Sequence, residues 1–324
     1  MEKVNILIAG GAGYVGTLLA NTLVKDDHQV DVVDYFWFGD YLDPEITRHV
    51  GNIFDLTIDS LKNNKYDVVV FLAGLSNDPM ANYDPAGNFI ENSAAPSYLA
   101  YIAKESGVSR FVYASSCSVY GFTDGEALDE DCNPKPHYPY GIAKLQAESA
   151  IMLLEDENFK PISLRKGTIG GWSPRMRFDL VVNAMTKSAI TSGKIVVNNP
   201  NLWRPLIDIR DVVQSYVKSI ETNVTGIFNI CAQNYTIGDL AAEIRYELIK
   251  HGHNIEIETM HKEDIRNYKA SNKKAKELLG FEPIYSPSDS VREILENIDL
   301  NNINFGDERY YNIQTFKKVK NEFK

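Results

Sequence analysis

Short apolar runs alternate with amphipathic segments along the first two thirds of the chain. Runs rich in Val, Ile and Leu predict buried strands at residues 4–9, 29–34, 67–73, 110–116 and 161–165. The segments between them carry apolar positions at helical spacing and predict helices over residues 14–25, 86–105 and 140–155. This alternation is typical of βαβ units. The expected fold class is therefore α/β, with a Rossmann-type doubly wound parallel sheet.

The alternation weakens after residue 166. Glycine, proline and tryptophan are frequent in 167–205, where one helix is predicted at about 180–192, and residues 226–230 predict one more strand of the sheet. Beyond residue 234 we expect a helix over 237–250, a strand over 255–259 and two short helices. We therefore expect residues 1–166, completed by about 206–233, to form the Rossmann domain. Residues 167–205 and 234–324 are expected to form a smaller, interleaved C-terminal lobe for the substrate.

Composition and charge exclude several other classes of protein. A net charge of −11 argues against sequence-independent nucleic-acid binding, which requires a basic surface. The three cysteines, Cys117, Cys132 and Cys231, lack CxxC spacing, so we expect reduced thiols and no metal site. No run approaches the roughly 20 apolar residues of a membrane span, and the first strand is too short for a signal peptide. We therefore expect a cytoplasmic protein without membrane contact.

A glycine cluster between the first strand and the first helix predicts a dinucleotide site. Gly10, Gly13 and Gly16 allow a tight turn and a close approach of the backbone to a pyrophosphate, which rests on the helix N-terminus. Asp34 closes the second strand and is placed to accept hydrogen bonds from ribose hydroxyls. Its carboxylate would also repel a 2′-phosphate, so NAD is the expected cofactor rather than NADP.

Three residues after the fifth strand predict acid–base chemistry. Ser116 ends that strand, and Tyr140 and Lys144 lie four residues apart on the next predicted helix, where they share one face. A lysine ammonium beside a phenol favours the phenolate, which makes Tyr140 a candidate general base for a sugar hydroxyl. Ser116 is placed to hydrogen-bond the same oxygen. The simple alternative is a surface-facing Tyr–Lys pair, and the preceding glycine motif favours catalysis.

Together these motifs resemble the extended short-chain dehydrogenase/reductase family, in its sugar-nucleotide epimerase/dehydratase branch. The resemblance extends over most of the chain, through the glycine loop, Gly51-Asn52-Ile53-Phe54-Asp55, Leu72-Ala73-Gly74-Leu75-Ser76 and Tyr113-Ala114-Ser115-Ser116-Cys117-Ser118-Val119-Tyr120-Gly121. It implies that NAD contacts Gly10, Gly13, Tyr14, Val15, Gly16, Asp34, Asn52, Ile53, Leu72, Ala73, Gly74, Asn92, Tyr140 and Lys144. It implies a catalytic set of Ser116, Tyr140 and Lys144.

The resemblance also implies a nucleotide-diphosphate sugar as the substrate. Arg204, in Trp203-Arg204-Pro205, and the late Arg266 are similar to arginines that grip a diphosphate, for which guanidinium forks are suited. The other substrate contacts implied are Ser116, Cys117, Ser118 and Asn183. Family members commonly pair through two long helices, so a homodimer is expected, with segments 86–105 and 140–155 at its interface.

The reaction beyond the first oxidation stays open. We expect oxidation of a ring hydroxyl, at C4, by an epimerase or dehydrogenase of activated-sugar or surface-polysaccharide synthesis. Dehydratases of this branch have acids where this chain has Cys117 and Ser118, so a 4,6-dehydratase is disfavoured. The epimerase segment Leu-Arg-Tyr-Phe-Asn-Pro is replaced by Leu164-Arg165-Lys166-Gly167-Thr168-Ile169. The remaining alternatives are an NAD(P)H-dependent keto-sugar reductase and a non-catalytic dinucleotide sensor.

Overall fold

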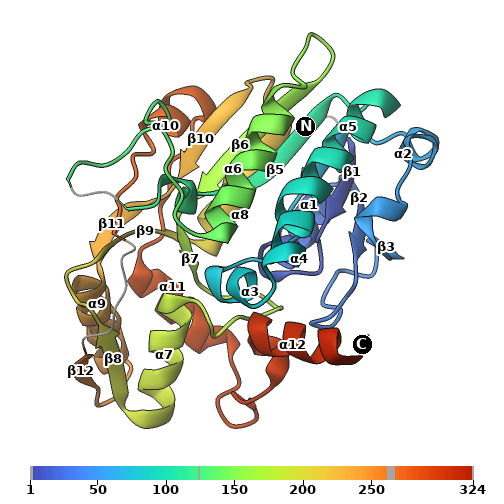
Figure 1. Ribbon diagram of the computed structural model, residues 1–324. Helices are drawn as coiled ribbons and strands as arrows, with labels where there is room; N and C mark the ends of the chain where they lie inside the picture. Colours follow the sequence, from blue (N-terminus) through green and yellow to red (C-terminus); the bar gives the residue numbers. More distant parts are fainter. Residues whose placement is uncertain (1–2, 123–124, 261–266, 323–324) are drawn as a thin grey trace.

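In the part of the chain that the structure describes, seven parallel strands form the central sheet. The computed structural model covers residues 3–122, 125–260 and 267–322 in this description (Figure 1). The strand order is β10-β6-β5-β4-β1-β2-β3, and all neighbours are parallel. The strands are β1 (Asn5–Ala9), β2 (Gln29–Asp34), β3 (Thr47–Val50), β4 (Val68–Phe71), β5 (Arg110–Ser116), β6 (Lys160–Lys166) and β10 (Gly226–Ile230). The predicted doubly wound parallel sheet is confirmed.

Helices cover both faces of this sheet, which explains why its central strands β1, β4 and β5 are buried on both sides. α1 (Tyr14–Lys25) and α8 (Ile209–Glu221) pack on one face. α2 (Ile58–Asn64), α5 (Ala95–Ser106) and α6 (Pro139–Met152) pack on the other. All four residues of β4 are buried as a result. The order of strands reverses beside β1 and β4, and the carboxyl ends at such a point form a ligand-binding crevice.

The predicted helix over 86–105 is interrupted in the structure. It consists of α4 (Pro85–Phe89), a π-helical turn at Ile90–Ala94 and α5. Pro96 has no N–H group to donate to the carbonyl of Asn92, which instead accepts a hydrogen bond from the Tyr113 hydroxyl at 3.3 Å. The wider turn is therefore a local consequence of this proline, and it leaves Asn92 buried within the cavity wall.

The second group of elements has its own apolar core. It contains α7 (Val181–Ser192), α9 (Ile237–Lys250) and α11 (Pro287–Asn297), with a sheet β11-β9-β7 and a strand pair β12-β8. The strands are β7 (Thr168–Gly170), β8 (Lys194–Asn198), β9 (Trp203–Asp208), β11 (Gln233–Thr236) and β12 (Glu256–Met260). The helices α7 and α9 and the strand β12 were predicted, whereas β7, β8, β9 and β11 were not. β7 and β11 are only three and four residues long, which is too short for a clear period, and β9 has Arg204, Pro205 and Asp208 among its six residues.

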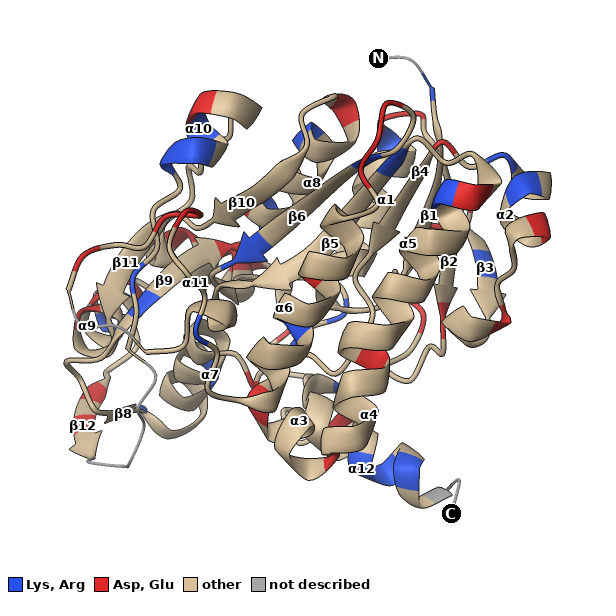
Figure 2. Ribbon diagram, turned by 45° about the horizontal axis from the view of Figure 1, so that its top comes forward, with Lys and Arg blue, Asp and Glu red and all other residues tan. Residues whose placement is uncertain are grey.

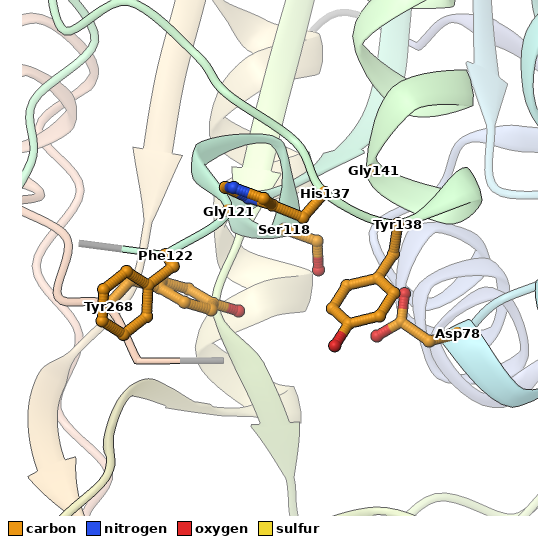
Figure 3. Close-up of a pocket in the computed structure, with 8 residues that line it drawn as sticks. All are labelled: Asp78, Ser118, Gly121, Phe122, His137, Tyr138, Gly141 and Tyr268. Atoms are coloured by element: carbon orange, nitrogen blue, oxygen red, sulfur yellow. The ribbon is translucent and has the colours of Figure 1, made fainter. Parts of the chain in front are cut away.

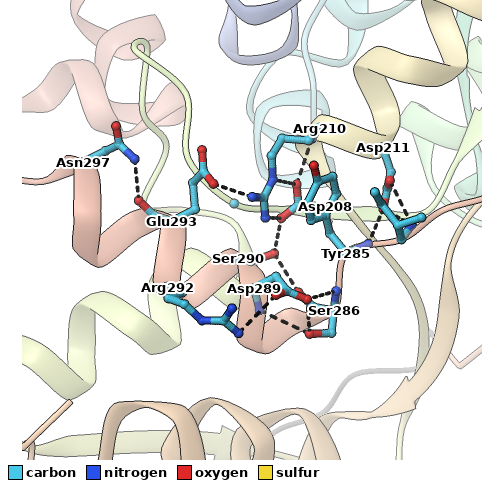
Figure 4. Close-up of polar contacts among 12 residues, drawn as sticks. Asp208, Arg210, Asp211, Tyr285, Ser286, Asp289, Ser290, Arg292, Glu293 and Asn297 are labelled. Carbon is cyan, nitrogen blue, oxygen red and sulfur yellow. Dashed lines mark hydrogen bonds and ion pairs between the residues drawn. The ribbon is translucent and has the colours of Figure 1, made fainter. Parts of the chain in front are cut away.

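Polar contacts join β9 and α8 to α11 (Figure 4). Arg210 donates to Asp208 at 2.8 Å and forms an ion pair with Glu293 on α11. Asp211 accepts from the backbone N–H groups of Ile284 and Tyr285. These contacts fix the end of β9 against the rest of the chain, and β9 carries Arg204 into the cavity.

Two further helices, α10 (Lys273–Leu279) and α12 (Asn312–Glu322), flank α11 along the chain. A helix at 312–322 was not predicted. No helix in the described ranges is long and apolar enough to cross a membrane. Lys and Arg alternate with Asp and Glu over the elements shown in Figure 2, without a mainly basic side in that view.

Candidate active site

A cavity of about 790 Å³ lies at the carboxyl ends of β1, β2, β4, β5 and β6. Its volume is within the roughly 300–1,000 Å³ that is typical of ligand sites. Its lining includes the glycine loop and Asp34 at one end and Ser116, Tyr140 and Lys144 farther along. The second group of elements and the loop before α7 contribute Arg204 and several residues between 175 and 188 to the same lining: Arg175, Arg177, Asp179, Leu180, Val181, Ala184, Met185 and Ser188. The predicted cofactor, catalytic and substrate segments therefore meet in one cavity.

The glycine loop approaches the neighbouring backbone too closely for side chains. Gly10 has a φ of +82°, and a Cβ there would lie 2.4 Å from the backbone nitrogen of Ala73. A Cβ on Gly16 would lie 2.4 Å from the carbonyl oxygen of Gly10. The first turn of α1 contains no acidic residue. The first turn of α1 therefore adds no negative charge of its own to this helix N-terminus, which fits a pyrophosphate.

Asp34 is held in a fixed orientation at the end of β2. One carboxylate oxygen accepts from the N–H of Ala12 and the other from the N–H of Phe36, both at 3.0 Å. Burial raises the pKa of Asp34, and these hydrogen bonds oppose that increase. The carboxylate lines the cavity beside the glycine loop, so its position fits a ribose with free hydroxyls.

The remaining predicted cofactor residues also line the cavity. They are Tyr14, Val15, Asn52, Ile53, Leu72, Ala73, Gly74 and Asn92. The Asn92 amide donates to the carbonyl of Leu75 and to Asn88 at 2.9 and 2.8 Å, so it also holds the loop after β4. The Tyr14 hydroxyl donates to the carbonyl of Gly171 at 2.6 Å, which ties α1 to the second group of elements.

Ser116, Tyr140 and Lys144 lie together at the middle of the cavity. Lys144 Nζ is 5.8 Å from the centre of the Tyr140 ring and 5.2 Å from that of Tyr113. The Ser116 hydroxyl donates to the Ser118 hydroxyl at 3.1 Å, and Ser116 lowers the pKa of Tyr140. The four-residue spacing on α6 and the end of β5 therefore bring the three side chains to one place.

Burial controls the ionisation of this group. It raises the pKa of the Tyr140 hydroxyl, Asp78 raises it further, and Arg177 and Ser116 lower it. Burial also lowers the pKa of Lys144 to about 7. The sequence-based expectation was that a Lys144 ammonium favours the Tyr140 phenolate. In the protein alone, desolvation outweighs that attraction, because it disfavours the charged form of both groups.

Arg204 reaches the cavity from β9. Its guanidinium lies 5.7 Å from the centre of the Tyr268 ring and donates to the carbonyl of Trp203 at 2.8 Å. Both Arg204 and Tyr268 line the cavity. The predicted second arginine, Arg266, lies outside the described residues.

Cys117 and Asn183 do not line the cavity, although both were predicted to contact substrate. Cys117 has no exposed surface, its thiol donates to the carbonyl of Arg165, and burial raises its pKa well above the ordinary value. Asn183 is also fully buried and donates to the carbonyls of Gly171 and Arg177. The structure thus gives both side chains a role in packing and loop support.

A small side pocket of about 20 Å³ adjoins the main cavity (Figure 3). It is lined by Asp78, Ser118, Gly121, Phe122, His137, Tyr138, Gly141 and Tyr268. Asp78, Ser118 and Tyr268 line both this pocket and the main cavity. Burial raises the pKa of Tyr268 to about 12. Sequence reasoning missed Asp78 and Tyr268, because neither stands in a motif with a defined role.

Lys166 and two arginines of the loop before α7, Arg175 and Arg177, also line the cavity. Lys166 is the strand neighbour of Ser116, and its Nζ donates to the Tyr216 hydroxyl at 2.9 Å. Arg177 forms a two-point ion pair with Asp179. Lys166 occupies the segment where the epimerase sequence pattern was absent, and that departure was the available signal for it.

Comparison with families of known proteins gives one match to most of the chain. The model of the NAD dependent epimerase/dehydratase family matches residues 6–231. The UDP-glucose 4-epimerase of Corynebacterium glutamicum is 26% identical over 312 residues, which cover 90% of this chain and 94% of that protein. The UDP-glucuronic acid decarboxylase 1 of Xenopus tropicalis is 27% identical over 296 residues, covering 87% and 69%.

Solved structures share the fold. The UDP-glucuronic acid 4-epimerase from Bacillus cereus, solved with UDP-glucuronic acid and NAD, superposes with a TM-score of 0.79 at 23% identity. The match covers 89% of this chain and 97% of that one.

Proposed function

Because the chain belongs to the NAD dependent epimerase/dehydratase family, we propose that it oxidises a ring hydroxyl of a nucleotide-activated sugar, at C4. It acts as an epimerase or dehydrogenase in the synthesis of activated sugars. The observation that carries this proposal is the meeting of Ser116, Tyr140 and Lys144 with the glycine loop and Asp34 in one cavity. The predicted family is confirmed.

The residues present fit NAD. Backbone N–H groups at the start of α1 receive the pyrophosphate, since Gly10 and Gly16 leave room for it. Asp34 accepts from the adenosine ribose and disfavours a 2′-phosphate. Asn52 and Ile53 face the adenine side, and Lys144 holds the second ribose. When bound, the oxidised nicotinamide supplies a hydride acceptor and a positive charge.

In the proposed mechanism, Tyr140 is the general base. Its hydroxyl oxygen, as phenolate, takes the proton of the sugar hydroxyl, while Ser116 donates a hydrogen bond to the same sugar oxygen. Lys144 holds Tyr140 in place, and its ammonium compensates the phenolate. Since burial alone raises the pKa of Tyr140, the base forms only in the loaded site, where the positive charge of the cofactor offsets desolvation.

The substrate is proposed to be a nucleoside-diphosphate sugar. Arg204 lines the cavity from β9, and its guanidinium is suited to diphosphate oxygens. The relatives named above act on UDP-sugars, as their names state. Dehydration is the second candidate, and it is less favoured because Cys117 is buried and Ser118 is not an acid.

The test is product analysis in deuterated water. The protein is incubated with UDP-, GDP-, CDP- and dTDP-sugars, and NADH absorbance and sugar NMR signals are followed. A new epimer without lasting NADH establishes epimerisation, and lasting NADH with a keto product establishes dehydrogenation. Tyr140→Phe should abolish turnover and retain NAD binding. Full activity in that variant would exclude the mechanism.

We also propose a cytoplasmic homodimer. The location is supported by the three cysteines, which are free thiols. The dimer is supported by exposed apolar side chains on the helices of segment 86–105, where Ile90 is 49% and Tyr101 is 52% exposed. Tyr101→Arg should shift the protein to monomer in light scattering after size-exclusion chromatography, and a monomeric parent protein would remove this proposal.

A further inference from the structure

Helix α12 contacts the cavity at its cofactor end. Its first residue, Asn312, lines the cavity together with Trp37, Ser76 and Arg175. Figures 1 and 2 both show α12 beside α3 (Asp78–Tyr83) and α4. The helix therefore forms part of the wall around the site proposed for NAD.

Asn312 ties together the two sides of that wall. Its side-chain oxygen accepts from Arg175 Nη2 at 2.5 Å, and its Nδ2 donates to Ser76 Oγ at 2.7 Å. Its backbone N–H donates to Asp179 at 3.3 Å. Ser76 follows β4 of the main sheet, whereas Arg175 and Asp179 belong to the loop between β7 and α7. One residue thus connects the Rossmann strands to the second group of elements.

Phe316 anchors the helix one turn later. Its side chain is 5% exposed, and its ring centre lies 6.0 Å from that of Trp37 and 6.1 Å from that of Tyr83. Trp37 in turn stacks on Tyr35 with 5.2 Å between ring centres. Both Trp37 and Tyr35 line the cavity next to Asp34. Packing of Phe316 therefore fixes the wall beside the proposed adenosine position.

An ion pair holds the C-terminal part of α12. Lys320 forms an ion pair with Asp84, which is only partly exposed. The contacts of α12 therefore extend from the loop after β2, across the segment after β4, to the loop before α7. Such a helix cannot stay docked while those three segments separate.

We propose that α12 is a strap that retains the cofactor and must detach before NAD is exchanged. This inference rests on the proposed function. Detachment breaks the Asn312 hydrogen bonds and exposes Phe316, so cofactor exchange is slow compared with turnover. Slow exchange suits epimerisation, in which NAD is regenerated within the site. A net dehydrogenase must instead release NADH in every turnover, so the strap favours the epimerase form of the proposal.

The test measures cofactor exchange directly. Protein loaded with NAD is mixed with excess isotopically labelled NAD, and the bound fraction is followed by mass spectrometry. We expect exchange in Phe316→Ala to be at least tenfold faster than in the wild type, with a smaller increase in Lys320→Gln. NAD should also slow hydrogen exchange of the α12 amides in the wild type. Phe159→Ala is the matched control, since Phe159 is buried against Phe111 and does not line the cavity.

The outcomes are distinguishable. Equal exchange rates in wild type and Phe316→Ala, or equal acceleration in Phe159→Ala, would overturn the strap and leave the proposed function standing. A wild-type protein that binds NAD but exchanges it within the mixing time would do the same. A wild-type protein that binds no NAD would overturn both.

Discussion

Replacing Lys144 with methionine should stabilise the cofactor-free protein and abolish turnover. Lys144 is 4% exposed, and its Nζ lies 5.2 and 5.8 Å from the centres of the Tyr113 and Tyr140 rings. Removing an ammonium from water disfavours its charged form, so burial lowers the pKa from 10.5 to about 7. Methionine is also unbranched and carries no charge, so it fills this space without that cost.

The magnitude depends on pH. The difference between 10.5 and about 7 is about 3.5 pH units, and each unit corresponds to about 1.4 kcal/mol. Below pH 7 both folded and unfolded Lys144 are protonated, so burial of the charge lowers the free energy of unfolding by up to about 5 kcal/mol. Between pH 7 and 10.5 the folded protein has released the proton that the unfolded chain keeps, so stability rises with pH. At pH 9 about 2 kcal/mol of the penalty remains.

Urea unfolding of the cofactor-free protein at pH 6 and pH 9 measures this effect. Lys144→Met should be more stable than the wild type at both values, and its advantage should be about 3 kcal/mol larger at pH 6. Lys62→Met, at an exposed position on α2, is the control and should change stability little at either pH. The reasoning is refuted if Lys144→Met is destabilised at pH 6, or if its effect is the same at both values.

Three further perturbations test other parts of the site. Gly10→Ala places a Cβ 2.4 Å from the Ala73 nitrogen at a φ of +82°, so unfolding free energy should fall by about 2–4 kcal/mol in urea titration; an unchanged midpoint contradicts this. Asp34→Asn should weaken NAD binding about tenfold and reduce the preference of the protein for NAD over NADP, as measured by fluorescence titration. An unchanged preference would exclude the proposed contact of Asp34 with the ribose. In the native protein, an alkylating reagent at pH 8 should modify the half-buried Cys132 and leave Cys117 unmodified, as measured by mass spectrometry of the intact protein. Modification of Cys117 would contradict its buried placement.

The placement of Tyr140 beside Lys144 was predictable because its geometry is local. Two residues four apart on a helix share a face whatever surrounds them, so Tyr140 and Lys144 could be paired from their spacing. The strand before the glycine loop and Asp34 at the end of β2 follow from the same short-range pattern. The carboxyl ends of parallel strands then bring these segments together, which is a property of the fold class.

Burial and long-range contact were not predictable in the same way. Whether Lys144 is charged depends on how much water surrounds it, and this depends on residues from β5 and α6 packed around it. Helix α12 has few apolar positions, and its contact with Ser76 spans 236 residues. The π-helical turn at Ile90–Ala94 within the predicted helix over 86–105 was also not predictable, because the Tyr113 hydroxyl that donates to the carbonyl of Asn92 lies on β5.

The position of β10 has a consequence for dividing this protein into fragments. β10 pairs with β6 at the edge of the sheet, although the chain has formed β7, α7, β8, β9 and α8 in between. A fragment that ended after β6 would therefore leave that strand without its neighbour, and its apolar residues and free backbone groups would be open to other chains. We expect such a fragment to aggregate, so the two groups of elements must be produced and kept as one continuous chain.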